Sequence, residues 1–182
     1  TAVGGEIHEA EDGIYWRILR LGRILLELFV VATGTGKTGE ALIDKDGTVY
    51  RYLRDSTCKY LSIFGEITIV RAYYAKEGRA GRFPLDARLN LPKRKYSFVL
   101  QEWMASKAVE TSYEKAAAWV NKRLHLELAH RPLERVTRDC TEAVQDFMDS
   151  LPPPPAELEG PILVHTVDCK GIRMRSEDRR GN

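Results

Sequence analysis

The chain has 182 residues, of which 43% are hydrophobic and 30% are charged, as in a soluble globular protein with one domain or two small ones. Its formal net charge of +2 does not by itself require a nucleic-acid partner. Cys58, Cys140 and Cys169 are far apart and form no zinc-spaced pair. This cysteine pattern argues against a disulfide framework or a zinc ribbon, and it fits a reducing cytoplasm.

Residues 13–31 carry a helical pattern, after an acidic and glycine-containing stretch (1–12) that we expect to be loose. Apolar side chains recur at three- and four-residue spacing, at Ile14, Ile18, Leu21, Leu25, Leu28 and Phe29. A membrane span is not expected, because charges interrupt the apolar run at Arg17, Arg20, Arg23 and Glu27. A signal peptide is not expected either, since the run lacks a basic lead and a small-residue cleavage site. Such an apolar helix needs a partner, either the rest of the chain or a second copy.

The segment Val31–Thr38 nearly matches a phosphate-binding loop of the form G-x4-G-K-T. Val31 stands where that motif has its first glycine. The segment also follows a predicted helix and precedes a predicted strand, whereas a phosphate-binding loop leads from a strand into a helix. A plain loop is therefore the favoured interpretation, and nucleotide binding through Gly34–Lys37 is the weaker alternative.

Residues 39–95 predict a small antiparallel β region. Residues 41–52 form a hairpin pattern with Asp46-Gly47 as its turn, and 60–63 with 66–74 form a second pair of strands around Gly65. Alternation along 66–74 predicts one buried and one exposed face. Residues 75–95 contain several glycines and prolines and are expected to form a loop.

Three helices are predicted after Ser97, over 97–107, 112–124 and 132–151. The third has an apolar stripe at Leu133, Val136, Cys140, Val144 and Phe147. Pro132 suits its first turn, and Pro152–Pro155 would end it and form a stiff spacer.

The second and third of these helices resemble a helix-turn-helix, whose second helix enters the major groove of DNA. Arg131, Arg135 and Arg138 share one face of that helix, and arginine can bind guanine or phosphate. Further phosphate contacts could come from Lys93, Arg94, Lys95, Lys122 and Arg123. The alternative is an ordinary antiparallel helix pair whose arginines form ion pairs with Glu134, Asp139 or Glu142.

Residues 161–174 predict a buried strand that ends at Asp168, followed by a second short strand. Together with Tyr60–Tyr74, Phe83–Pro92 and Tyr96-Ser97, this segment resembles the front half of the Kra-type (ISKra) insertion-sequence transposases, over about residues 39–178. These are bacterial DNA transposases of the Asp-Asp-Glu class, with a ribonuclease-H-like catalytic fold. The family's V-D-G-K-G strand has glycine where this chain has Cys169.

The resemblance implies that Asp168 is the first of three catalytic carboxylates and a ligand of Mg²⁺ in a complete protein. The other two carboxylates are absent, so we expect no cofactor and no catalysis from this chain alone. It also implies double-stranded DNA at the element ends as the partner, a homo-oligomer, no membrane, and a bacterial, nucleoid-associated location in the cytoplasm. A non-catalytic remnant that dimerises or binds DNA is the competing interpretation.

The expected fold is α+β. It comprises a tail and amphipathic helix (1–38), the β region and loop (39–95), a helical DNA-binding segment (96–151), a proline-rich linker (152–160) and the truncated start of a catalytic domain (161–182), a β-hairpin like the beginning of a ribonuclease-H-like fold.

Overall fold

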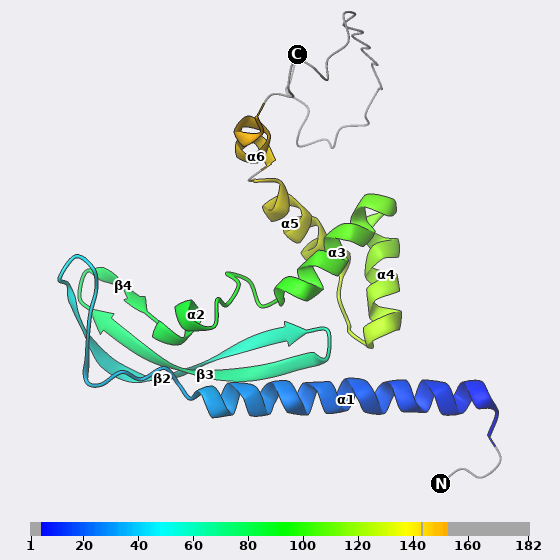
Figure 1. Ribbon diagram of the computed structural model, residues 1–182, viewed down its shortest axis with the longest axis horizontal. Coiled ribbons are helices and arrows are strands. Elements are labelled where there is room, and N and C mark those ends of the chain that lie inside the picture. The colour runs from blue at the N-terminus through cyan, green and yellow to red at the C-terminus, as the bar shows by residue number, and fades with distance from the viewer. Residues whose placement is uncertain (1–4, 143, 153–182) are drawn as a thin grey trace, which may run out of the picture. The chain divides into compact units, whose positions relative to one another are not determined.

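The computed structural model describes residues 5–142 and 144–152. The elements, in chain order, are α1 (Ile7–Thr33), β1 (Ala41–Ile43), β2 (Val49–Ser62), β3 (Gly65–Lys76), β4 (Arg79–Arg82), α2 (Pro84–Arg88), α3 (Phe98–Glu110), α4 (Tyr113–Leu124), α5 (His130–Thr141) and α6 (Val144–Ser150) (Figure 1). The predicted α+β class, with an N-terminal helix, an antiparallel sheet and then helices, is confirmed. The predicted hairpin within 161–182 lies outside the described residues.

Helix α1 begins at Ile7, so the prediction that residues 1–12 are loose is wrong for residues 7–12. The backbone N–H of Glu6 donates to the Glu9 carboxylate at 3.3 Å, which satisfies one donor at the start of the helix. Acidic side chains here also face the positive end of the helix dipole. Within the described ranges, none of the helices combines the length and apolar character that crossing a membrane requires.

The four strands form an antiparallel sheet in the order β1-β2-β3-β4. The predicted turn at Asp46-Gly47 is confirmed, and Gly47 has the positive φ of 77° that such a turn needs. The predicted hairpins are not separate, because β2 runs unbroken for 14 residues and pairs with β1 at one end and β3 along its length. An irregularity between Tyr52 and Arg54 shifts the register within this long strand.

The predicted alternation of β3 holds only for its first half. Ile67 and Ile69 are buried there, and Thr68 between them is exposed. Farther along, Ala72 and Tyr74 are also buried, on the opposite face. The reason is that the connection from α1 to β1 passes this end of the sheet. Ala72 N–H donates to the Thr35 carbonyl at 2.9 Å, and the Tyr74 hydroxyl accepts from Thr38 N–H at 2.9 Å.

The prediction of a loop over 75–95 is wrong in part, since β4 and α2 lie within it. Gly78, with φ 72°, allows the tight turn from β3 to β4, and Pro84 occupies the first turn of α2. The Asp86 side chain of α2 forms an ion pair with Arg71 of β3. This pair attaches the short helix to the sheet.

One side of α1 packs along the sheet (Figure 1). Val30 is buried with Ile67 and Ile69 of β3 and with Leu85 of α2. Gly22 lies against the β2–β3 turn, where a Cβ atom at this position would come within 2.6 Å of the Phe64 ring. The absence of a side chain at Gly22 is therefore what allows the helix and the turn to approach so closely.

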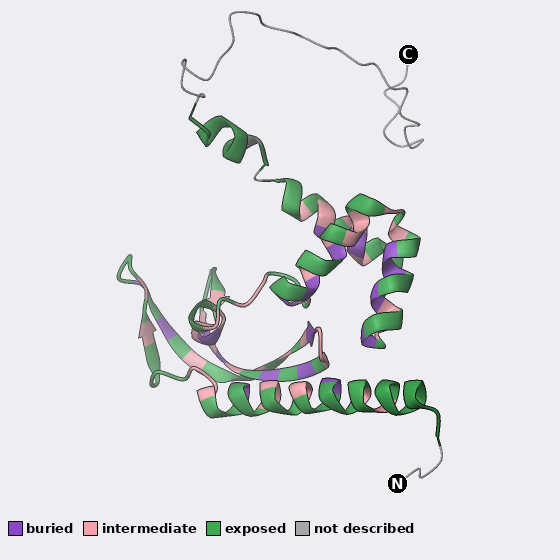
Figure 2. Cartoon of the chain, turned by 45° about the vertical axis from the view of Figure 1, so that its right-hand side comes forward, coloured by how far each residue is buried: buried purple, intermediate pink, exposed green. Residues whose placement is uncertain are grey.

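The helices α3, α4 and α5 enclose a second core. Figure 2 shows buried residues along the sides of these helices that face one another. The core consists of Leu61 from β2 with Leu100, Met104, Ala116, Ala117, Val120, Leu124, Leu128, Leu133 and Val136.

The prediction of one helix over 132–151 is wrong. The helix starts at His130, so Pro132 lies in its third position, and α5 ends at Thr141, before α6 begins. Of the predicted stripe, Leu133 and Val136 are buried, whereas Cys140, Val144 and Phe147 are exposed. An apolar pattern stabilises a helix chiefly where the stripe is packed, and here the packing ends after Val136.

We expect Gly22→Ala and Gly13→Ala to change stability in opposite directions. At Gly13 the new methyl group would meet only the flexible end of Arg17, at 3.3 Å, so the gain in helix propensity of about 0.5–1 kcal/mol should remain. At Gly22 the clash with Phe64 should cost roughly 1–3 kcal/mol and outweigh that gain. The urea unfolding midpoints of the two variants measure both stability changes. Equal shifts in the same direction would rule out the close packing of α1 against Phe64.

Candidate nucleic-acid interface

The connection between α4 and α5 has a defined conformation. The Ser112 hydroxyl accepts from the N–H of Lys115 at the start of α4, and His125, with φ 45° and ψ 47°, ends the helix in the left-handed region. The Asn121 side chain then donates to the Leu128 carbonyl at 2.9 Å and accepts from the Leu128 N–H at 2.8 Å. These contacts fix the path of the chain into α5.

The buried residues of α5 determine which side of this helix faces outward. Leu133 and Val136 are fully buried against α3 and α4. Because a helix turns once every 3.6 residues, the predicted arginines lie on other sides of it. Arg131, Arg135 and Arg138 are all exposed, as the sequence pattern predicted.

The ion pairs of these arginines differ. Arg138 lies 3.2 Å from the Glu134 carboxylate, one turn earlier on α5, while its side chain stays 72% exposed. Exposed pairs of this kind contribute little to stability and are readily exchanged. Within the part of the chain that the structure describes, neither Arg131 nor Arg135 forms a salt bridge.

The basic run Lys93–Lys95 lies beside α5. It lines a recess of about 330 Å³ together with Tyr96, Pro132 and Arg135. The run reaches this place because the chain returns to β2, where Leu61 N–H donates to the Lys95 carbonyl at 2.6 Å and the Leu61 carbonyl accepts from Ser97 N–H at 2.8 Å. Two of the predicted basic groups, far apart in sequence, therefore form one surface.

Arg94 is held by α5 itself. Its guanidinium donates to both carboxylate oxygens of Asp139, one of them at 2.8 Å, in the two-pronged geometry that arginine and a carboxylate favour. The hydrogen bond from Arg94 lowers the pKa of Asp139, and the charges of Lys93 and Arg138 act in the same direction. Asp139 is therefore ionised at neutral pH and offsets part of the positive charge.

Tyr96 is the aromatic residue of this recess. Partial burial raises the pKa of its hydroxyl, and the nearby charges of Arg135 and Arg94 oppose that rise. A neutral, partly buried tyrosine between cations can present a ring face or a hydroxyl to a nucleic acid.

Lys122 and Arg123, also predicted to bind DNA, lie elsewhere. They line a recess against the first turns of α1, together with Glu11 and Asp12. The Arg123 carbonyl accepts from the Tyr15 hydroxyl at 2.6 Å, and the Arg123 guanidinium lies over the Trp119 ring. The structure therefore groups this pair with acidic residues of α1 and not with the α5 recess.

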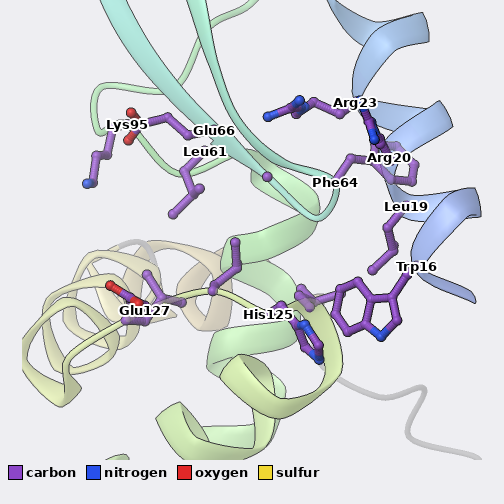
Figure 3. A pocket seen from close by; sticks show the side chains of 14 residues that line it. Trp16, Leu19, Arg20, Arg23, Leu61, Phe64, Glu66, Lys95, His125 and Glu127 are labelled. Carbon is purple, nitrogen blue, oxygen red and sulfur yellow. The ribbon is translucent and has the colours of Figure 1, made fainter. Parts of the chain in front are cut away.

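A larger recess of about 530 Å³ lies between α1, the β2–β3 turn and the α4–α5 connection. Figure 3 shows Arg20 and Arg23 extending from α1 near Phe64, and the Trp16 indole against the His125 ring. Its lining mixes Arg20, Arg23 and Lys95 with Glu66, Glu127 and apolar side chains, so it has no dominant charge.

The predicted metal ligand, Asp168, lies outside the described residues. In the described part of the chain, no cluster of three or more His, Cys, Asp or Glu side chains is arranged to hold a metal ion.

The Gly34–Lys37 segment crosses from α1 to β1, so its order is helix, loop, strand, the reverse of a phosphate-binding loop. The Lys37 ammonium lies 2.7 Å from the Glu40 carboxylate and 3.9 Å from the centre of the Tyr52 ring. This geometry favours a structural role for the segment.

Asn121 is the residue of this region whose role the sequence pattern did not predict. Asparagine is a poor residue inside a helix because its side chain competes for backbone hydrogen bonds. The signal in the sequence was an asparagine about one turn before the end of a predicted helix. In the structure its side chain hydrogen-bonds the backbone of Leu128, and this holds the connection to α5 in place.

The chain is similar to a protein of Streptococcus gallolyticus described as "UPF0236 protein in vanSb 3'region", with 26% identity over 118 residues. The match covers 64% of this chain, and it spans only about a quarter (25%) of that protein's length. No family model and no solved structure matches the chain. At this level of identity the similarity does not assign the chain to a family.

We expect Asn121→Ala to lower the free energy of unfolding by roughly 1–3 kcal/mol, since it leaves both partly buried backbone groups of Leu128 without their partner. Lys122→Ala, one position along and with no hydrogen bond to the connection among those of the described residues, is the matched control. Denaturant unfolding of both variants tests this, and equal stabilities would contradict the role of Asn121.

Proposed function

We propose that this chain is the DNA-binding, N-terminal portion of an insertion-sequence transposase, and that it docks on duplex DNA through α5 and the run Lys93–Lys95. The observation that carries the proposal is the meeting of these two basic segments around one recess on the exposed side of α5. The resemblance of several sequence motifs to the Kra-type transposases supports the choice of DNA over other anionic partners.

The charges of this surface suit a phosphate backbone. Lys93, Lys95, Arg131 and Arg135 have no salt bridge within the described residues, and Arg138 is only loosely paired. Double-stranded DNA presents one negative charge for about every 1.7 Å of its axis, so a surface with several free cations gains affinity by releasing counterions. Arginines along an exposed helix can then reach base edges in the major groove.

The alternative of an ordinary helix pair predicts that the arginines of α5 serve ion pairs. This applies to Arg138, which pairs with Glu134, whereas Asp139 is engaged by Arg94, which lies outside α5. It leaves Arg131 and Arg135 without such a role in the described part of the chain. These two are therefore the residues that separate the two interpretations.

A non-catalytic module that only binds DNA would use the same surface. The two proposals differ in the role of Asp168, which the transposase resemblance makes the first of three carboxylates that hold Mg²⁺ in a complete protein. Strand transfer that requires both the metal ion and Asp168 would distinguish an enzyme from such a remnant. DNA binding alone does not.

We expect Arg135→Ala to weaken binding to a mixed-sequence duplex by on the order of 1 kcal/mol, and to reduce the slope of log Kobs against log salt by about 1. The matched control is Arg51→Ala, which removes the same charge from an exposed position in β2, at the far end of the strand from Leu61. Gel shifts over a salt series measure the affinity and the salt dependence of both variants. Failure of the wild-type chain to retard DNA at low salt, or equal losses in the two variants, would refute the proposed surface.

We expect Asp139→Asn to tighten DNA binding several-fold at low salt. The change removes a negative charge from the basic surface and releases the Arg94 guanidinium, which the carboxylate otherwise engages. The gain should shrink as salt rises, because exposed charges are screened. Fluorescence anisotropy with labelled duplex measures the affinity, and the melting temperature checks that the fold is kept. Unchanged affinity would place the Arg94–Asp139 pair outside the DNA footprint.

A further inference from the structure

Helix α1 has an apolar stripe that its own chain leaves more than half exposed, with Ile14 and Ile18 also lining the recess against Lys122 and Arg123. Figure 2 shows the helix largely exposed away from the sheet. The stripe consists of Ile14, Ile18, Leu21, Leu25 and Leu28, whose exposed fractions all lie between 55% and 58%. Ile7, one heptad before Ile14, is 86% exposed. Large aliphatic side chains in such a continuous row indicate an interaction surface.

The spacing of the stripe identifies the kind of partner. From Ile14 to Leu28 the intervals alternate between four and three residues, which is the a/d seam of a coiled coil. Ile18 and Leu25 take a positions, and Ile14, Leu21 and Leu28 take d positions. The buried Leu19, one residue beyond Ile18, lies on the adjoining side that faces the sheet. Helix α1 can therefore pack on its own sheet and still offer this seam to another helix.

We propose that the seam binds α1 of a second copy of this chain, with the two helices antiparallel and Leu21 of one opposite Leu25 of the other. This register places Ile18 opposite Leu28, and Ile14 opposite Ala32. Every large apolar residue of the stripe then faces an apolar residue of the partner. The same patch serves both copies, as a two-fold interface requires.

Charge disfavours the parallel orientation. The first turns of α1 carry Glu6, Glu9, Glu11 and Asp12, and Glu11 occupies an a position. A parallel dimer would bring the two acidic runs together, which like-charge repulsion disfavours. In the antiparallel arrangement each acidic run lies beside the C-terminal end of the other α1. At that end the exposed Arg88 donates to the Thr33 carbonyl at 3.1 Å, and Lys37, which follows, is engaged by Glu40.

The size of the stripe is adequate for a dimer. Five long side chains, each more than half exposed, amount to several hundred Å² on each copy, and Phe29 beside them is 57% exposed. A stable interface buries roughly 800 Å² per partner, of which the apolar seam forms the centre. This inference does not depend on DNA binding, because α1 and α5 are separate surfaces of the chain.

Sedimentation of the full 182-residue chain over a concentration series tests the association. The wild type should form a dimer in the micromolar range, and Leu21→Glu should weaken it at least tenfold. Val109→Glu, at an exposed position of α3 away from the seam, should leave it unchanged. A wild-type chain that stays monomeric throughout, or equal effects of the two variants, would overturn the proposal. Binding of such a monomer to anionic vesicles would assign the stripe to a lipid surface.

Disulfide cross-linking tests the orientation. In a background with Cys58, Cys140 and Cys169 changed to serine, a mixture of Leu21→Cys and Leu25→Cys chains should form a covalent heterodimer on oxidation. Each variant alone should cross-link poorly, since disulfides need Cα atoms within roughly 7 Å. Efficient cross-linking by Leu21→Cys alone would overturn the antiparallel arrangement. Circular dichroism of each variant confirms that it is folded.

Discussion

The backbone of Leu61 joins the two halves of the main folded unit. Its N–H and carbonyl bond to Lys95 and Ser97, and its side chain is buried in the core of α3, α4 and α5. A strand of the sheet thus enters the helical core and holds the start of α3, where the Ser97 hydroxyl caps the helix by accepting from Leu100 N–H at 3.1 Å. This junction and the Arg94–Asp139 pair together place the run Lys93–Lys95 beside α5.

The sequence allows part of this arrangement to be predicted. Helix caps at Ser97 and Ser112, the turn at Asp46-Gly47 and the outward face of the arginines follow from local rules of capping, turn chemistry and helical period. These features depend only on residues a few positions apart. The proximity of Lys93–Lys95 to Arg135 depends instead on long-range pairing at Leu61, to which no local pattern points.

The errors have the same origin. The continuous β2 crosses the largely polar stretch 53–59, which carries little hydrophobic signal but pairs with β3 from Arg54 onward. The apolar stripe on 132–151 continues past the point where packing ends, so the pattern overestimated the helix. In both cases tertiary contacts, or their absence, decided the element against the local pattern. Propensity and periodicity predict which elements form more reliably than where they end.

The net charge of the chain is small, but its acidic and basic side chains are distributed unevenly over its surfaces. The acidic start of α1 lies next to Lys122 and Arg123. Its carboxylates offset the positive charge of this basic pair, which the sequence had predicted to bind DNA. The acids near α5 are fewer than its cations, and Asp139 is engaged by Arg94. Because exposed charges act over about 10 Å at moderate salt, this local balance and not the total of +2 determines where an anion is attracted. The same acidic run that neutralises Lys122 and Arg123 would oppose a parallel pairing of α1. In the two proposals, a single cluster of carboxylates would thus make Lys122 and Arg123 poor sites for DNA and would also influence how two copies meet.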